Sequence, residues 1–232
     1  MPKFAPMPLL AFAASAALIA AATLSVSAEQ AVNAPGPKIS APAPSAASET
    51  IVLAGGCFWG VQGVFQHVEG VQRAVSGYAG GRKSHPTYEQ VSSGATGSAE
   101  AVAVTFDPKK IALGEILRIY FSVAHDPTEI DRQGPDEGTQ YRSEIFANDP
   151  AQAKFARDYI AELDVAKVYP RAIATKVETG AAFYPAESYH QNYATLHPEQ
   201  PYIAYNDLPK IENLKRLFPA RYREKAQMVA AE

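Results

Sequence analysis

The stretch IVLAGGCFWG, residues 51–60, organises this chain and holds its only cysteine and its only tryptophan. Four apolar residues predict a short buried strand, and the two glycines after them predict a tight turn. Apolar residues then recur at the three- and four-residue spacing of a helix, at Phe58, Val61, Val64, Phe65 and Val68. A helix is therefore expected to begin at or just after Cys57.

A cysteine at such a strand-to-helix turn faces the free N–H groups and the positive dipole end of the helix. This environment lowers the pKa of a thiol and favours the nucleophilic thiolate. A free cysteine also commonly serves as a small buried hydrophobic residue. This stretch alone therefore leaves two interpretations of Cys57 open, a nucleophile and a packing residue.

The N-terminus predicts a secretory signal peptide over residues 1–28. Lys3 supplies a positive charge, residues 9–24 are almost wholly apolar, and Val26-Ser27-Ala28 has the small-x-small pattern of a cleavage site. The apolar run is short for a membrane span of about 20 residues, so cleavage is favoured over an uncleaved anchor. We expect export, to the bacterial periplasm. Residues 29–49, rich in Ala, Pro and Ser, predict a disordered or partly extended linker that buries no apolar surface.

Residues 50–232 have the length and apolar content of one domain. The whole chain carries 21 basic and 24 acidic residues without a basic stripe, which argues against nucleic acid as a partner. A single cysteine excludes an internal disulfide and a cysteine-based metal site. In an oxidising compartment, a lone thiol is either buried or kept for chemistry.

Strands and helices alternate along this domain. Beyond the Cys57 helix, strands are expected at 71–78, 99–106, 140–147 and 171–178, longer helices at 111–124, 151–163 and 208–218, and short ones at 88–92 and 188–196. Two long irregular stretches lie at 125–139 and 179–209, and loops of such length are usually functional. The order predicts an α+β fold, a two-layer sandwich of split βαβ (ferredoxin-like) units with a long C-terminal coil that frays after Pro219.

Glu100 is a candidate for a buried carboxyl group, because the residues after it in its strand are small or apolar. Burial of a lone carboxylate raises its pKa, since desolvation disfavours the charged form. A rise from about 4.3 to about 7 corresponds to roughly 3.7 kcal/mol, which needs a shielded pocket. The alternative is an exposed glutamate at the end of a strand.

Four more polar residues lie in or beside the loops, namely Tyr88, Tyr141, Asp136 and His190. Each tyrosine either points its hydroxyl group into a cleft or packs half-buried. Asp136, within Gly-Pro-Asp-Glu-Gly, is also explained by a turn. His190 suggests a Cys57–His190 dyad, as in a cysteine hydrolase or acyltransferase. No other ligand has metal-site spacing, so a metal is disfavoured.

The segment Gly56-Cys57-Phe58-Trp59-Gly60 resembles the signature of the A-type peptide methionine sulfoxide reductases. Further matches follow in the same order: Gly77-Tyr78, Gly80-Gly81, Pro86-Thr87-Tyr88, Ser93-Gly94, Thr96-Gly97, Ala99-Glu100-Ala101-Val102, His125-Asp126-Pro127-Thr128, Arg132-Gln133-Gly134, Asp136, Gly138-Thr139-Gln140-Tyr141-Arg142-Ser143, Ala186-Glu187 and His190-Gln191. The resemblance covers residues 51–218, nearly the whole domain.

The resemblance implies a monomeric enzyme without bound cofactor or metal that reduces methionine-S-sulfoxide, free or in exported proteins. It implies that Cys57 is the nucleophile, which becomes a sulfenic acid, and that Glu100 is the proton donor. Tyr88, Tyr141 and Asp136 are then the polar shell. Phe58 and Trp59 are the apolar wall for the substrate methyl group.

Three departures from the family pattern bear on this reading. Ser98 stands where a histidine is frequent, and Pro135 stands where an asparagine is common. No second cysteine is present to resolve the oxidised Cys57. The expected reductant is therefore an external thiol, from a thioredoxin-like or glutaredoxin-like protein, or dithiothreitol in vitro. A non-catalytic module that binds oxidised methionine peptides is a further alternative.

Overall fold

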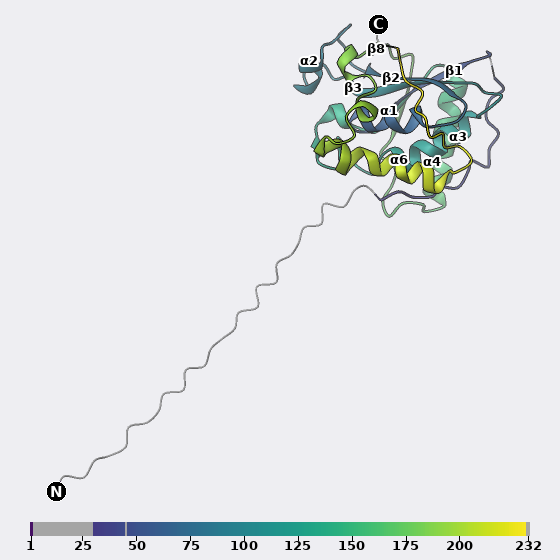
Figure 1. Ribbon diagram of the computed structural model, residues 1–232. Helices are drawn as coiled ribbons and strands as arrows, with labels where there is room; N and C mark the ends of the chain where they lie inside the picture. Colours follow the sequence, from purple (N-terminus) through teal and green to yellow (C-terminus); the bar gives the residue numbers. More distant parts are fainter. Residues whose placement is uncertain (2–29, 45, 231–232) are drawn as a thin grey trace.

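The computed structural model describes residue 1, residues 30–44 and residues 46–230 (Figure 1). Six strands form one mixed sheet in the order β7-β6-β1-β3-β2-β8. They are β1 (Glu49–Ala54), β2 (Val71–Ala79), β3 (Ala99–Phe106), β6 (Glu144–Ala147), β7 (Lys176–Thr179) and β8 (Phe183–Pro185). All neighbours are antiparallel except β6 and β7. Since β3 lies between β1 and β2, the unit β1-α1-β2 is the expected split βαβ unit.

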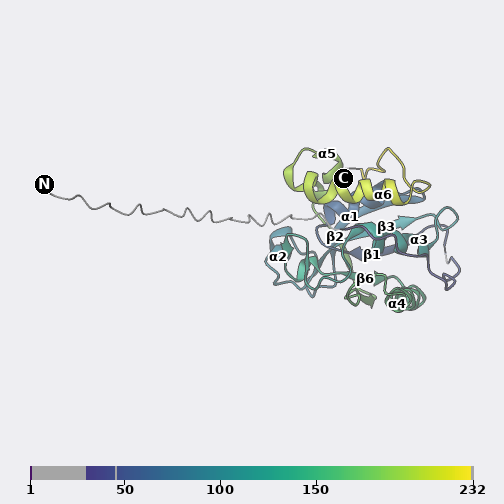
Figure 2. The same ribbon diagram turned by 90° about the horizontal axis from the view of Figure 1, so that it is seen from below.

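The longer helices gather on one side of the sheet, below the strands in Figure 1, and α6 runs beside α1 in Figure 2. The helices are α1 (Phe58–Gln66), α2 (Tyr88–Ser92), α3 (Leu113–Ile119), α4 (Pro150–Val165), α5 (Tyr193–Leu196) and α6 (Leu208–Leu217). A π-helical turn, Tyr120–Ala124, continues α3, and another, Ile203–Asp207, leads into α6. The α+β prediction is confirmed.

Alternation along β3 builds the core and aims one polar residue at the site. Val102, Val104 and Phe106 are fully buried and belong to the main core that the helices cover. Ala101 faces the other way, into a small alanine-rich cluster. Glu100 shares the face of Val102 because side chains alternate along a strand. Its carboxyl group is thus directed towards the beginning of α1.

The predicted starts of two strands in the second half of the domain are wrong. The strand expected at 140–147 begins only at Glu144, because Thr139–Tyr141 form a 3₁₀ turn after Gly138, whose φ is 132°. The strand expected at 171–178 begins at Lys176, and the N–H of Ala174 bonds instead to the oxygen of Pro127.

The predictions of one helix over 188–196 and of a frayed tail after Pro219 are both wrong, and Asn192 explains both differences. Asn192 is left-handed, with a φ of 61°, and it separates a 3₁₀ turn at Ser188–His190 from α5. Its side chain also donates to the oxygen of Val229 and accepts from the N–H of Val229, both at 2.9 Å. The tail up to residue 230 is therefore fixed to the domain.

The predicted linker is packed rather than loose in its described residues, 30–44 and 46–49. The chain is extended there, but Ala34 is fully buried, and its N–H donates to Oγ of Ser122 at 3.1 Å. Nε of Arg118 donates to the oxygen of Ala34 at 2.8 Å. Polar side chains of α3, of the π-helical turn after it and of α4 form hydrogen bonds with the extended backbone of this segment. The prediction that this segment buries no apolar surface is therefore wrong.

We expect this arm to stabilise the domain. A chain that begins at Ala46 should have a free energy of unfolding lower by roughly 2–4 kcal/mol than one that begins at Gln30. It loses the burial of Ala34 and several hydrogen bonds, including that from the Tyr159 hydroxyl to the oxygen of Pro35 at 2.6 Å. Urea unfolding of the two chains measures the difference. Coincident unfolding curves would show that the arm adds no stability.

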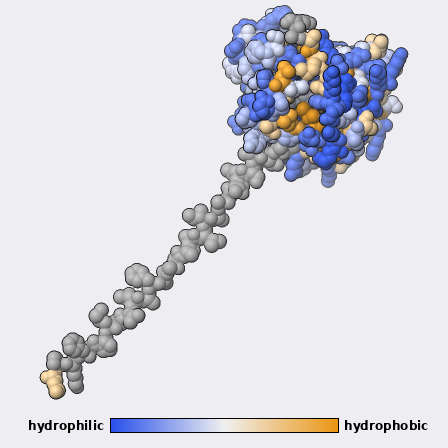
Figure 3. All heavy atoms as spheres, viewed as in Figure 1, coloured by the Kyte–Doolittle hydropathy of each residue, from blue (hydrophilic) through white to orange (hydrophobic). Residues whose placement is uncertain are grey.

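Over the part of the chain that the structure describes, no helix is both long and apolar enough to cross a membrane. Figure 3 shows one face of the domain as mostly hydrophilic, with hydrophobic residues in small groups. The predicted signal segment, 1–28, lies outside the described residues apart from Met1. The signal peptide and the periplasmic location therefore stay predictions.

Candidate active site

Two glycines bring the turn before α1 into close contact with the loop after α3. Gly56 has a φ of +83°, and a Cβ atom there would lie 2.6 Å from Cβ of Gln133. A Cβ atom on Gly55 would lie 2.9 Å from Cγ of His125. Only glycine gives the left-handed backbone at position 56 and the space at both positions. The turn thus places Cys57 at the N-cap position of α1.

Cys57 opens into a cavity of about 190 Å³ that collects the residues singled out from the sequence. The lining residues are Cys57, Phe58, Trp59, Tyr88, Glu100, Asp136, Tyr141 and Tyr202. All seven predicted site residues line it. Tyr202, the eighth, was not predicted. It comes from the aromatic-rich stretch 179–209, where no local pattern distinguishes it from its neighbours.

Glu100 is buried beside the first turn of α1. Its side chain is only 2 % exposed, and Oε2 accepts the N–H of Phe58 at 3.1 Å. Burial raises the pKa of this carboxyl group to about 8, against the smaller opposing effect of that hydrogen bond. The alternative of an exposed strand-end glutamate is wrong. At neutral pH the group holds a proton that it can donate into the cavity.

The expected lowering of the Cys57 pKa is wrong. Cys57 is 8 % exposed, and burial raises the pKa of its thiol well above the ordinary value. The acidic groups of Glu100 and Asp207 raise it further when they are ionised. The N–H of Trp59 at the helix end does lower the pKa, but more weakly than these effects. Local sequence revealed the helix end and not the depth of the surrounding core. The resting thiol is therefore protonated.

Tyr88 and Tyr141 line the cavity from two separate elements. Tyr88 begins α2, and its N–H donates to Glu187 at 2.9 Å, which ties α2 to the stretch after β8. Tyr141 ends the 3₁₀ turn after Gly138. Burial is the largest cause that raises the pKa of both phenols, so both keep their protons and can act as donors.

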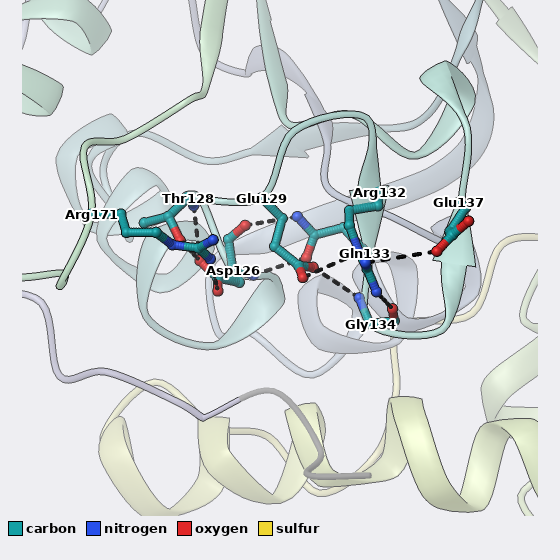
Figure 4. A network of polar contacts seen from close by, with 8 residues as sticks. All are labelled: Asp126, Thr128, Glu129, Arg132, Gln133, Gly134, Glu137 and Arg171. Carbon is teal, nitrogen blue, oxygen red and sulfur yellow. Dashed lines mark hydrogen bonds and ion pairs between the residues drawn. The ribbon is translucent and has the colours of Figure 1, made fainter.

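Asp136 enters the cavity from a two-stranded hairpin, β4 (Arg132–Gln133) and β5 (Asp136–Glu137). Figure 4 shows the polar network that holds this hairpin. Nε2 of Gln133 donates to the oxygen of Asp126 at 2.7 Å, and the N–H of Gly134 donates to Glu129 at 2.9 Å. The hairpin therefore forms with Pro135 at its tip.

Inside the cavity, the Asp136 carboxylate accepts a hydrogen bond from the hydroxyl group of Tyr202. Burial raises the pKa of Asp136, while Tyr202 and the nearby Lys210 act in the opposite direction. Ser98, the other departure from the family pattern, is buried but does not line the cavity. A Cβ atom on Gly81 would lie 2.0 Å from Oγ of Ser98, so Ser98 packs against Gly81.

Phe58 and Trp59 form the apolar wall, and His190 belongs to the support of that wall. Trp59 stacks on Tyr193 with ring centroids 3.9 Å apart. Nε1 of Trp59 donates to Nδ1 of His190 at 3.2 Å. His190 is therefore an acceptor for Trp59 and does not line the cavity, so the suggested Cys57–His190 dyad is not formed.

Among the described residues, no group of three or more His, Cys, Asp or Glu side chains is arranged to hold a metal ion. The chemical groups of the cavity are instead one thiol, one protonated carboxyl group, phenolic donors and an aromatic wall. This set suits the transfer of a proton to a substrate oxygen while sulfur attacks.

Comparison with known proteins identifies the family. Residues 49–222 match the family model described as "Peptide methionine sulfoxide reductase". A protein of that name from Mesorhizobium japonicum is 60 % identical over 182 residues, which span 78 % of this chain and 93 % of its own. One from Thermus thermophilus is 46 % identical, over 75 % of this chain and 98 % of its own.

Two solved structures share the fold. Mxr1 of Saccharomyces cerevisiae in reduced form is 35 % identical with a TM-score of 0.61, and the match covers 68 % of this chain and 91 % of Mxr1. Methionine sulfoxide reductase A of Corynebacterium diphtheriae is 33 % identical with a TM-score of 0.58, over 73 % and 89 % of the two chains. The chain belongs to the peptide methionine sulfoxide reductase family and is an oxidoreductase.

Proposed function

We propose that this enzyme reduces methionine-S-sulfoxide, free or within exported proteins, through a sulfenic acid on Cys57. The observation that carries the proposal is the protonated carboxyl group of Glu100 beside the thiol, in a cavity walled by Phe58 and Trp59. An apolar wall on one side and hydroxyl donors on the other distinguish the methyl group of a sulfoxide from its oxygen.

In the first step, the sulfur of Cys57 attacks the sulfoxide sulfur, and Glu100 gives its proton to the sulfoxide oxygen. The thiol is protonated before substrate binds. The sulfur atom of the polarised S–O bond carries partial positive charge, and this charge next to Cys57 favours the thiolate once the sulfoxide is bound. Oxygen passes to the sulfur of Cys57 as methionine leaves, and two electrons pass to the methionine sulfur. The proton that the thiol loses restores Glu100 through solvent. The products are methionine and a sulfenic acid.

Tyr88 and Tyr141 donate hydrogen bonds to the substrate oxygen as negative charge builds on it. We expect Tyr88→Phe and Tyr141→Phe each to lower the rate of sulfoxide reduction by roughly 10- to 100-fold, and the double variant by more. Tyr205→Phe, at a side chain 76 % exposed, is the control and should keep the rate. Single-turnover rates measure the effect. Unchanged rates in the double variant would remove both tyrosines from the mechanism.

Recycling requires an external thiol, because the sequence contains no second cysteine. One thiol attacks the sulfenic acid of Cys57, which releases water and leaves a mixed disulfide. A second thiol displaces Cys57 as a free thiol and carries away a disulfide. We propose a thioredoxin-like or glutaredoxin-like protein as the donor, in the periplasm of the source bacterium, and a monomeric enzyme. N-terminal sequencing of the exported protein tests cleavage after Ala28.

An assay with separated sulfoxide epimers and dithiothreitol tests the function. Methionine should form from the S-epimer and not from the R-epimer. A cysteine hydrolase would instead form an acyl-enzyme from esters or amides without any need for thiol. A module that only binds oxidised peptides would form no methionine, and Cys57 in it would resist alkylation. No methionine from either epimer would refute the proposal.

A further inference from the structure

A buried ion pair lies against the helix that carries the nucleophile. Asp207, the last residue of the π-helical turn before α6, is fully buried, and Lys210 in the first turn of α6 is 7 % exposed. Nζ of Lys210 lies 3.9 Å from Oδ1 of Asp207. Charged side chains are seldom buried to this degree unless a function or a tight pairing requires it.

The Asp207 carboxylate contacts the first turn of α1. A Cβ atom on Gly60 would lie 2.1 Å from Oδ1 of Asp207, so the carboxylate occupies the space that a side chain at position 60 would need. Gly60 lies three residues after Cys57. Negative charge is favourable at the N-terminal turn of a helix, where the dipole is positive. Asp207 therefore contacts the N-terminal end of α1, where Cys57 is the N-cap residue.

This pair is also part of the electrical surroundings of the thiol. Acidic groups face Cys57 from three elements, with Glu100 on β3, Asp136 on β5 and Asp207 before α6, and each of them raises the pKa of the thiol when it is ionised. The phenols of Tyr88, Tyr141 and Tyr202 line the same cavity. The Lys210 ammonium group is a nearby positive charge, and it lowers the pKa of Asp136 and of the buried His125.

We propose that Asp207 and Lys210 are positioning residues that hold the first turn of α1 and set the balance of charge at Cys57. Asp207 packs against α1 and thereby places a negative charge near Cys57. Lys210 offsets this charge of Asp207. The pair thus allows three acidic groups to surround one thiol without suppressing its ionisation fully. This inference rests on the proposed role of Cys57 as the nucleophile.

The test is the pH dependence of Cys57 alkylation by iodoacetamide in the full chain, because only the thiolate reacts. Lys210→Met should move the midpoint of the curve upwards by about half a pH unit, a roughly threefold loss of thiolate at a given pH. Asp207→Asn should move it downwards by a similar amount. The double variant should lie near the parent protein, and Lys210→Arg should restore the parent midpoint.

Lys215→Met is the matched control, since Lys215 lies on the same helix with its side chain 50 % exposed. Structural damage alone would move both single variants in the same direction. Shifts in the same direction, or a Lys210→Met midpoint equal to that of Lys215→Met, would overturn the proposal. If one single variant does not fold, the other still decides, because the proposal fixes the direction of its shift relative to Lys215→Met. Alkylation needs no sulfoxide turnover, so this inference and the proposed function can fail separately.

Discussion

Replacement of Cys57 by serine is expected to abolish sulfoxide reduction, with a loss of roughly 10⁴-fold or more. A serine hydroxyl group in this buried site does not ionise near neutral pH and forms no sulfenic acid. No other thiol in the chain can take over the role. Stopped-flow measurement of methionine formation with excess dithiothreitol gives the rate of each protein.

The fold of the Cys57→Ser variant should be intact, because the substitution only replaces the sulfur atom by oxygen at a residue that is 8 % exposed. Circular dichroism and the unfolding midpoint check this. Cys57→Ala serves as the matched control, since it also lacks the thiol and fills less of the cavity. A folded serine variant that still formed methionine at a hundredth of the parent rate would disprove nucleophilic attack by Cys57.

Glu100→Gln should lower the rate of the reduction step by about 10²- to 10³-fold, because an amide donates a hydrogen bond but no proton. Glutamine can still accept the N–H of Phe58, which the glutamate accepts at 3.1 Å, so the local structure should hold. Glu89→Gln, at an exposed glutamate on α2, is the control and should keep the parent rate. If Glu100→Gln retained full activity, the proton donor would have to be another group.

The pH dependence of stability follows from the same carboxyl group. Burial raises the pKa of Glu100 in the folded protein to about 8, above the ordinary value of 4.5 that the unfolded chain has. Between these two values the folded state holds a proton that the unfolded state has released. The contribution of Glu100 to the free energy of unfolding is therefore fully present below pH 4.5. It decreases by on the order of 1 kcal/mol per pH unit between pH 4.5 and about pH 8. Glu100→Gln should remove this slope in urea unfolding curves.

The alternation of strand 99–106 and the helical spacing after Cys57 predicted the split βαβ unit. These signals are local, and each is set by one face of one element. The packed arm at residues 30–44 could not be predicted, because its Pro- and Ala-rich composition also suits a loose linker. Its order comes from Ser122, Arg118 and Tyr159, which lie far away in sequence.

The residues of the site likewise fall into those that the sequence predicted and those that it did not. The sequence pattern identified Cys57 and Glu100, and the family resemblance supplied the roles of Tyr88, Tyr141 and Asp136. Tyr202 and Asp207 were missed, because neither follows a motif and both reach the site only through the packing of the stretch before α6 on α1. The raised pKa of Cys57 was missed for a related reason, since burial by distant elements outweighs the local helix end.

Cys57 is expected to take the sulfoxide oxygen, and the sequence holds no other thiol that could release it. The enzyme is mixed with excess methionine-S-sulfoxide and dimedone, with no added thiol, and the methionine and the mass of the Cys57 peptide are measured. We expect one methionine per enzyme and one dimedone adduct on Cys57. Continued methionine formation without thiol, or methionine formed while Cys57 remains unmodified, would contradict this role of Cys57.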